Sequence, residues 1–166
     1  MNIFYLDKDP RLSAQYHNNK HVVKMILETA QLLSTAHHIL DGSNAPQGIY
    51  KPTHKNHPSA IWIRSGVDQY RWGFDLFGFL IDEFHYRYMK PHACERLIPI
   101  LINNPINIDY DALWSEPPQC MPDECKVEGD AVEAYRNYYI AHKSHLAKWT
   151  VRNIPSWYSL KPIESA

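Results

Sequence analysis

The clearest pattern of hydrophobic and polar positions covers residues 17–38. Apolar side chains recur there at steps of three and four, the spacing of one face of an α-helix. With Asn18 or Asn19 as its N-cap, the pattern predicts a helix that ends near Ile39. The residues expected on the buried face are Val23, Ile26, Leu27, Ala30, Leu33 and Leu40.

A stripe of polar side chains follows the same helix. Its members, again three or four positions apart, are His21, Lys24, Glu28, Gln31, Thr35 and His38. One interpretation is a solvated face, on which Lys24 and Glu28 form an i,i+4 ion pair worth ~0.3 kcal/mol. The other is that His21 to Glu28 form the floor of a site, with a carboxylate placed for acid–base or cation-stabilising chemistry. In that case Thr35 and His38 are merely solvated.

A second helical pattern spans residues 58–90. Pro58 suits its first position, and Gly66 predicts a break or bend. Its expected buried face consists of Tyr70, Phe74, Phe77, Leu80, Ile81, Phe84 and Tyr88.

The remaining segments are shorter or irregular. The N-terminal half begins with an apolar arm or strand over 1–7 and a short helix over about 10–16. Later come a short helix from Cys94, ended by Pro99 or Pro105, and a clear helix over 129–149. Residues 103–128 are proline-rich and irregular, and residues 153–162 form an aromatic tail.

These elements predict the fold class. We expect an all-α protein with a single compact helical domain over 1–166 and long proline-rich irregular segments, because no repeat or linker interrupts the pattern.

Composition narrows the partners. The net charge of −1 argues against coating duplex DNA through bulk positive charge, although a local basic cleft stays open. We therefore expect DNA binding that is weak and salt-sensitive at best. Neither a signal peptide nor a membrane-spanning run of ~18 apolar residues is apparent, and three cysteines suit a reducing cytosol.

The stretch "THKNHPS" is a candidate anion site. His54, Asn56 and His57 directly precede a helix start, where free backbone N–H groups attract phosphate, and Arg64 follows two turns later. Plain capping by Asn56 or His57 is the alternative.

The stretch "AYRNYY" is a candidate base-binding surface. Tyr135 and Tyr139 share a helix face, and Arg136 is adjacent, a combination that suits stacking on a base. The alternative is that the tyrosines belong to the core and Arg136 to the surface.

The cysteines offer only a loose metal motif. His92, Cys94, Cys120 and Cys125 have the donor types of a zinc site, but their spacing is atypical. We therefore expect no metal and no cofactor, and thiols that are buried or idle.

Two family resemblances add to these interpretations. "MNIFYLDKDP", "KHVVKMILETAQLLSTAH", "THKNHPSAIWIR", "MPDE" and "AYRNYY" resemble a widespread, poorly characterised family of tailed-phage proteins, over nearly the whole chain. This resemblance implies a phage origin and a location in the host cytoplasm.

The second resemblance is to the phage pyrimidine-dimer DNA glycosylases, the endonuclease V-like family. It rests on the His21 to Glu28 spacing, on the aromatic helix of residues 57–84 and on the tail "IPSWYSL". It implies an endonuclease V-like helical scaffold, in which the N-terminal α-amine attacks the deoxyribose C1′ and a helix-borne carboxylate assists. Glu28 matches that carboxylate and His21 the family's histidine, whereas Leu27 and Gln31 stand where the family has arginines. The chain also starts with Met-Asn, and Met is usually retained before a residue as large as Asn, so the free Thr-like amine of that family is not supplied.

The resulting hypothesis is an enzyme that acts on a nucleobase or N-glycosidic bond of DNA or a nucleotide. Glu28 would be catalytic with His21, while His21, Lys24, Gln31 and the two candidate stretches would bind phosphate or base. One alternative is a non-catalytic module that binds a nucleotide or inhibits a host protein. Another is a structural protein without a pocket.

Overall fold

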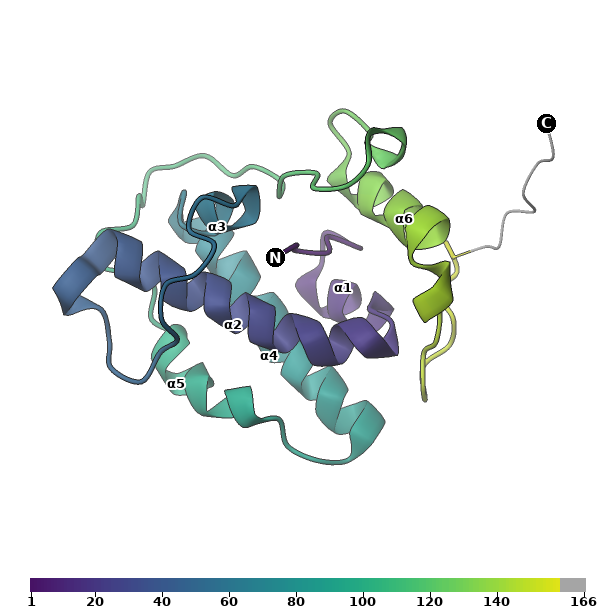
Figure 1. The fold of residues 1–166 in the computed structure, drawn as a ribbon, viewed down its shortest axis with the longest axis horizontal. Helices are drawn as coiled ribbons and strands as arrows, with labels where there is room; N and C mark the ends of the chain where they lie inside the picture. The colour runs from purple at the N-terminus through teal and green to yellow at the C-terminus, as the bar shows by residue number, and fades with distance from the viewer. Residues whose placement is uncertain (159–166) are drawn as a thin grey trace.

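Two long helices, α2 (Asn19–Asp41) and α4 (Val67–Tyr88), cross at the centre of the molecule (Figure 1). They belong to a computed structural model that describes residues 1–158. Helix, 3₁₀ turns included, accounts for 56% of the described residues, and these residues contain no strand, so the all-α class is confirmed. None of the helices in this part of the chain is long and apolar enough to cross a lipid bilayer.

The helix α2 begins where the sequence predicts and ends two residues later. The Asn18 side chain accepts a hydrogen bond from the His21 backbone N–H, which caps the first turn. Gly42 terminates the helix with a φ of 53°, a left-handed conformation that favours glycine.

The buried face of α2 is rotated from the predicted one. Val23 and Leu27 are 41% and 40% exposed, so their assignment to the core is wrong. Thr35, expected in solvent, is fully buried, because its hydroxyl bonds the backbone N–H of Thr53 at 3.1 Å. His38 is half-buried and bonds the Tyr50 carbonyl at 3.0 Å. The loop after α2 supplies these backbone partners. They satisfy the hydrogen-bonding groups of the polar side chains, which can therefore be buried on an inner face.

The predicted break at Gly66 is confirmed, since α3 (Pro58–Ile63) ends before it and α4 begins after it. A Cβ on Gly66 would lie 2.8 Å from the Ala112 Cβ, so the irregular segment packs directly on this backbone. The expected inner face of α4 lies in or against the core, and the buried Tyr70 hydroxyl donates to the Leu101 carbonyl at 2.7 Å.

The first residues form an extended arm, one of the two conformations predicted. Residues 3–6 are buried, and α1 (Pro10–Tyr16) follows and packs on α4. Two side chains hold the arm: the Ser13 hydroxyl donates to the Phe4 carbonyl, and Arg136 donates to the Leu6 carbonyl at 2.8 Å.

The 3₁₀-helices and α5 (Ile98–Leu101) are short. The loops contain three of these 3₁₀-helices: η1 (Gly42–Asn44), η2 (Ala93–Leu97) and η3 (Asp123–Cys125). Pro99 lies in the first turn of α5, where its missing N–H costs nothing, so the expectation that it ends a helix is wrong. Residues 103–128 are irregular apart from η3, as predicted.

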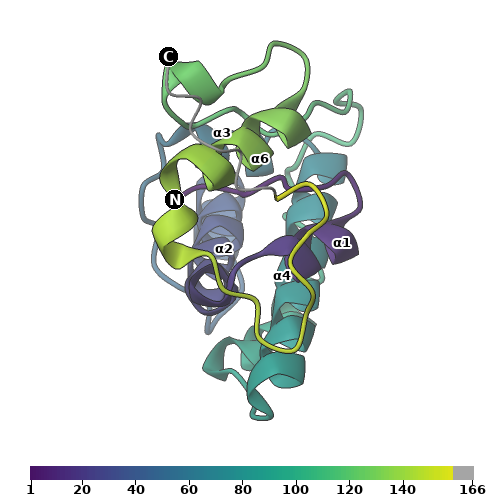
Figure 2. The same ribbon diagram turned by 90° about the vertical axis from the view of Figure 1, so that its right-hand side faces the viewer.

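The last helix, α6 (Ala131–His142), is shorter than the predicted 129–149 and is followed by η4 (Ser144–Leu146). The chain then passes the start of α2 and turns back across α4 (Figure 2). Trp149 donates to the Tyr16 carbonyl at 2.8 Å, and Arg152 pairs with the buried Glu83. Of the expected aromatic tail, residues 159–162 lie outside the described residues.

Candidate functional site

Glu28 lies on α2 against the start of the chain. Its Oε1 is 3.4 Å from the α-amine of Met1, and the side chain is only 16% exposed. Its Oε2 is buried and has no hydrogen-bond partner. This oxygen is therefore free to accept a hydrogen bond from a bound group.

This carboxylate opens into a small cavity of about 140 Å³. The N-terminal arm, α2 and the C-terminal end of α6 supply its walls. The lining residues are Met1, Asn2, Phe4, His21, Lys24, Met25, Glu28, Tyr138 and Lys143. The upper part of the polar stripe therefore lines a small, partly open cavity.

His21 is a neutral imidazole in this cavity. Burial, followed by the positive charge of neighbouring groups such as Lys143, lowers the pKa of His21 to about 3. Its Nδ1 lies 2.7 Å from the Tyr139 hydroxyl, which already accepts from the Asn18 backbone N–H. Since Tyr139 has no other acceptor in the described chain, its hydroxyl donates to Nδ1, and the ring proton is on Nε2. His21 is thus a hydrogen-bond donor here and not a phosphate-binding cation.

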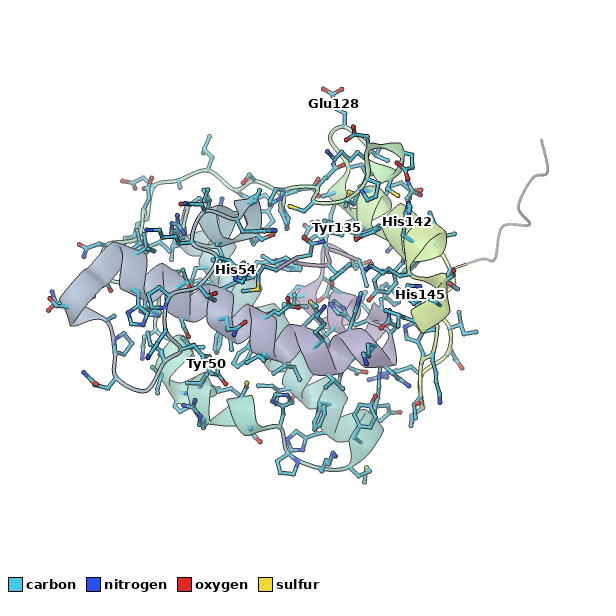
Figure 3. All side chains as sticks on the ribbon, viewed as in Figure 1. Tyr50, His54, Glu128, Tyr135, His142 and His145 are labelled. Atoms are coloured by element: carbon cyan, nitrogen blue, oxygen red, sulfur yellow. The ribbon has the colours of Figure 1, made fainter. Side chains whose placement is uncertain are left out.

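A basic groove adjoins the cavity and shares Lys24 with it. The groove has a volume of about 800 Å³ and lies between the first turns of α2 and the segment from η4 to Thr150. Lys20, Lys24, Lys148 and His145 contribute to its walls, and no carboxylate does. Figure 3 shows His145 beyond the end of α6, on the side of the molecule where α2 begins. A chain with a net charge of −1 therefore has a locally cationic surface beside Glu28.

The "THKNHPS" residues do not reach the cavity, which none of His54, His57 and Arg64 lines. The pKa of His57 is lowered, mainly by burial. The Met1 ammonium lowers it further, and the Glu28 carboxylate acts in the opposite direction. His57 is therefore an electrostatic neighbour of the cavity. Its Nδ1 accepts from the Ser59 N–H at 3.0 Å, so the capping alternative describes it.

The other residues of this stretch are dispersed. His54 is exposed and bonds the Thr53 hydroxyl, and Asn56 is exposed. Arg64 ends α3 half-buried, with its Nη1 lacking a partner. The α3 helix has only six residues, and His57 already bonds one of its first N–H groups. Few N–H groups and a small helix dipole therefore remain for binding phosphate at its start.

The "AYRNYY" residues mostly serve the fold, which corrects their assignment to base binding. Tyr135 and Tyr139 are fully buried, and the Tyr135 hydroxyl donates to the Pro118 carbonyl. Arg136 pairs with Asp7 at 3.1 Å and holds the N-terminal arm. The tyrosine that faces the cavity is Tyr138, which lies parallel to the Phe4 ring at a centroid distance of 6.0 Å.

Sequence reasoning missed Tyr138 and Lys143, which line the cavity from the end of α6. Gln31, on the next turn after Glu28, is half-buried and does not line the cavity.

The four residues of the loose zinc motif do not come together. Cys94 lies 3.4 Å from the Tyr50 hydroxyl, His92 caps the N–H of Cys94, and Cys120 lies 4.0 Å from the Ser59 hydroxyl. Among the residues that the structure describes, the group with metal-type donors is instead Glu124, Cys125 and His142.

Comparison of the chain with protein-family models, with curated proteins and with solved structures gives no match. Function must therefore be inferred from the geometry of the cavity and the groove.

Proposed function

We propose that this protein binds DNA in the basic groove and acts at an N-glycosidic bond, with Glu28 as the catalytic carboxylate. The observation that supports this most is the contact between the Glu28 carboxylate and the Met1 α-amine inside a small, partly closed cavity. The proposal keeps the phage origin and host-cytoplasmic setting that the sequence resemblance implies.

The paired groups can divide the chemistry between them. In a chain that begins at Met1, Glu28 accepts a proton from the α-ammonium, and the free amine attacks the deoxyribose C1′. The N–C1′ bond forms as the bond from C1′ to the base breaks, and the base leaves with the bonding electrons and then takes up a proton. The departing base takes its proton from Glu28, which returns Glu28 to the carboxylate form that stabilises positive charge at C1′ and on the attached nitrogen. The C1′–O4′ bond then opens as a proton passes from that nitrogen to O4′, which leaves the imine that borohydride reduces.

The neighbouring residues have supporting roles. The Nε2–H of His21 donates to an oxygen of the sugar or the leaving base, since the imidazole is uncharged. Lys24, shared by the cavity and the groove, fits a phosphate next to the attacked nucleotide. Lys20 and Lys148 extend that cationic path along the strand.

The decisive experiment measures covalent capture and base release. The full chain is incubated with duplexes that carry an abasic site or ultraviolet-induced pyrimidine dimers, with borohydride present to reduce an imine. We expect a protein–DNA adduct with the abasic duplex and base release from the damaged one. Glu28→Gln should lower the rate by ~100-fold or more, because removing a positioned acid–base group costs at least that.

The exposed Glu128, far from the cavity at the tip of the loop before α6, supplies the matched control (Figure 3). Glu128→Gln should react like the unchanged protein. Absence of both adduct and base release would overturn the enzymatic proposal.

The groove alone also suits a protein that binds DNA without turnover, and binding measurements separate the two. Lys20→Gln with Lys148→Gln should weaken binding and reduce the slope of log K against log salt by about 2, one phosphate contact per lysine. Lys51→Gln with Lys55→Gln, exposed and outside the groove, is the control. A binder would retain full affinity in Glu28→Gln and show no adduct.

A further inference from the structure

Three side chains with metal-binding donor atoms meet where η3 packs on α6. Glu124 and Cys125 belong to η3, and His142 is the last residue of α6 (Figure 3). One donor atom from each lies within 4.8 Å of the donor atoms of the other two. We propose that Glu124, Cys125 and His142 form a binding site for a divalent cation of the zinc type.

The donor set suits zinc in both chemistry and charge. Thiolate sulfur, imidazole nitrogen and carboxylate oxygen are the three donor types that zinc uses in proteins. A thiolate and a carboxylate carry two negative charges together, and a neutral imidazole adds none, so a doubly charged cation leaves the site neutral. Three protein ligands leave the fourth tetrahedral position to a water molecule.

The present geometry needs only small movements. A tetrahedral zinc site holds its donor atoms ~3.3–3.8 Å apart, given metal–ligand lengths of about 2.0–2.3 Å. His142 Nε2 and Glu124 Oε1 are 2.9 Å apart in an ion pair. Their side chains are 38% and 66% exposed and free to adjust, whereas Cys125 is buried and fixed. The Asn137 side chain donates to the Cys125 carbonyl at 3.2 Å, which holds η3 on α6 with or without a metal.

This set differs from the one suggested by cysteine spacing. Cys120, the partner of Cys125 in the C-x₄-C stretch, faces Ser59 of α3. The third ligand instead comes from His142, which is 18 positions from Glu124. The expectation of a metal-free protein rested on the poor spacing of His92 and the cysteines, a pattern to which His142 does not belong.

The test uses the full chain under reducing conditions, with zinc as the ligand and a chromophoric chelator as the competitor. We expect one zinc per chain. Cobalt(II) in its place should give a thiolate-to-metal charge-transfer band, which Cys125→Ser removes. His142→Gln should weaken zinc binding by more than ~100-fold, beyond the usual loss for a residue that only supports a ligand. Cys120→Ser and His145→Gln are the matched controls and should keep full affinity.

Three results would overturn the proposal. They are the absence of stoichiometric zinc, the absence of the charge-transfer band, and an equal loss of affinity in Cys120→Ser and Cys125→Ser. The cluster would then be an ordinary His–Glu pair beside a buried thiol. Circular dichroism checks each variant, and because His142 is exposed, its substitution remains informative even where replacement of the buried Cys125 disturbs folding.

Discussion

At the scale of single residues, buried polar side chains in this protein are placed by partners distant in sequence. Arg87 is the clearest case, because it bonds Glu83 on its own helix and the carbonyls of Gln15 and His17. It lies on the predicted inner side of residues 58–90, where helical periodicity leads one to expect an apolar side chain. Sequence spacing could place Glu28 and His21 on one face of a helix, but it could not show that a main-chain amine lies against Glu28.

The two buried histidines at the start of α2 give stability a defined pH dependence. Burial lowers the pKa of His17 to about 4, and burial likewise lowers that of His21 to about 3, both from 6.5. The folded state therefore keeps both rings neutral, while the unfolded chain binds protons as the pH falls below 6.5. Their contribution to stability is present above about pH 6.5. As the pH falls, the His17 part is lost progressively down to about pH 4 and the His21 part down to about pH 3.

We expect His17→Asn to flatten part of this dependence. Asparagine keeps a donor for the Ser13 carbonyl, which His17 Nδ1 contacts at 2.6 Å, but it does not titrate. Between pH 6.5 and 4.5 the variant should lose about 2 kcal/mol less stability than the unchanged protein, measured by urea unfolding at each pH. His145→Asn, at an exposed position, serves as control. Parallel stability curves for all three proteins would contradict the assignment.

At the scale of elements, most helix boundaries and the inner face of α4 were predictable, whereas the inner face of α2 was not. Local chemistry fixes the boundaries: Asn18 caps α2, Pro58 starts α3 and Gly66 separates α3 from α4. The buried face depends on what packs around a helix. In α2, Thr35 is buried because its hydroxyl accepts a hydrogen bond from the Thr53 backbone N–H in the following loop. The spacing of apolar residues does not predict this contact.

The close packing of α3 on α4 gives a matched glycine test. A Cβ on Gly73 would overlap the Ile63 Cδ1 and lie 3.1 Å from its Cγ1, whereas a Cβ on Gly78 meets nothing within 4 Å. We expect Gly73→Ala to lower the free energy of unfolding by ~1–3 kcal/mol through overpacking. Gly78→Ala in the same helix should raise it by up to ~1 kcal/mol through helix propensity. Denaturant unfolding measures both, and equal shifts would show that this contact is not tight.

At the scale of the whole molecule, segments that are distant in sequence complete the domain together. The Asn19 side chain bonds Thr150, and the Asn2 side chain bonds the Cys120 carbonyl. The compact helical domain was predictable from composition and periodicity. The closing segment after α6 was not, because residues 143–149 continue the helical pattern while the structure leaves the helix at His142.

Trp149 measures how much this closing segment contributes. It is 8% exposed and donates to the Tyr16 carbonyl, so Trp149→Ala should cost ~3–5 kcal/mol of unfolding free energy. Trp114 is 43% exposed, and Trp114→Ala should cost about 1 kcal/mol. Urea unfolding followed by circular dichroism gives both values. If the Trp149 variant is as stable as the Trp114 variant, the segment rests on the domain without stabilising it.

The N-terminal arm has a consequence for how the protein is made on the ribosome. Its apolar residues 3–6 are buried, yet Arg136, which holds the Leu6 carbonyl, lies 130 positions later. At ~5–20 residues per second, that partner is synthesised on the order of ten seconds after the arm. During this interval the arm leaves the exit tunnel without its final cover. Contacts with α1, α2 and α4 can form earlier, but the cover that α6 supplies, with Arg136 on the Leu6 carbonyl, can form only near the end of synthesis.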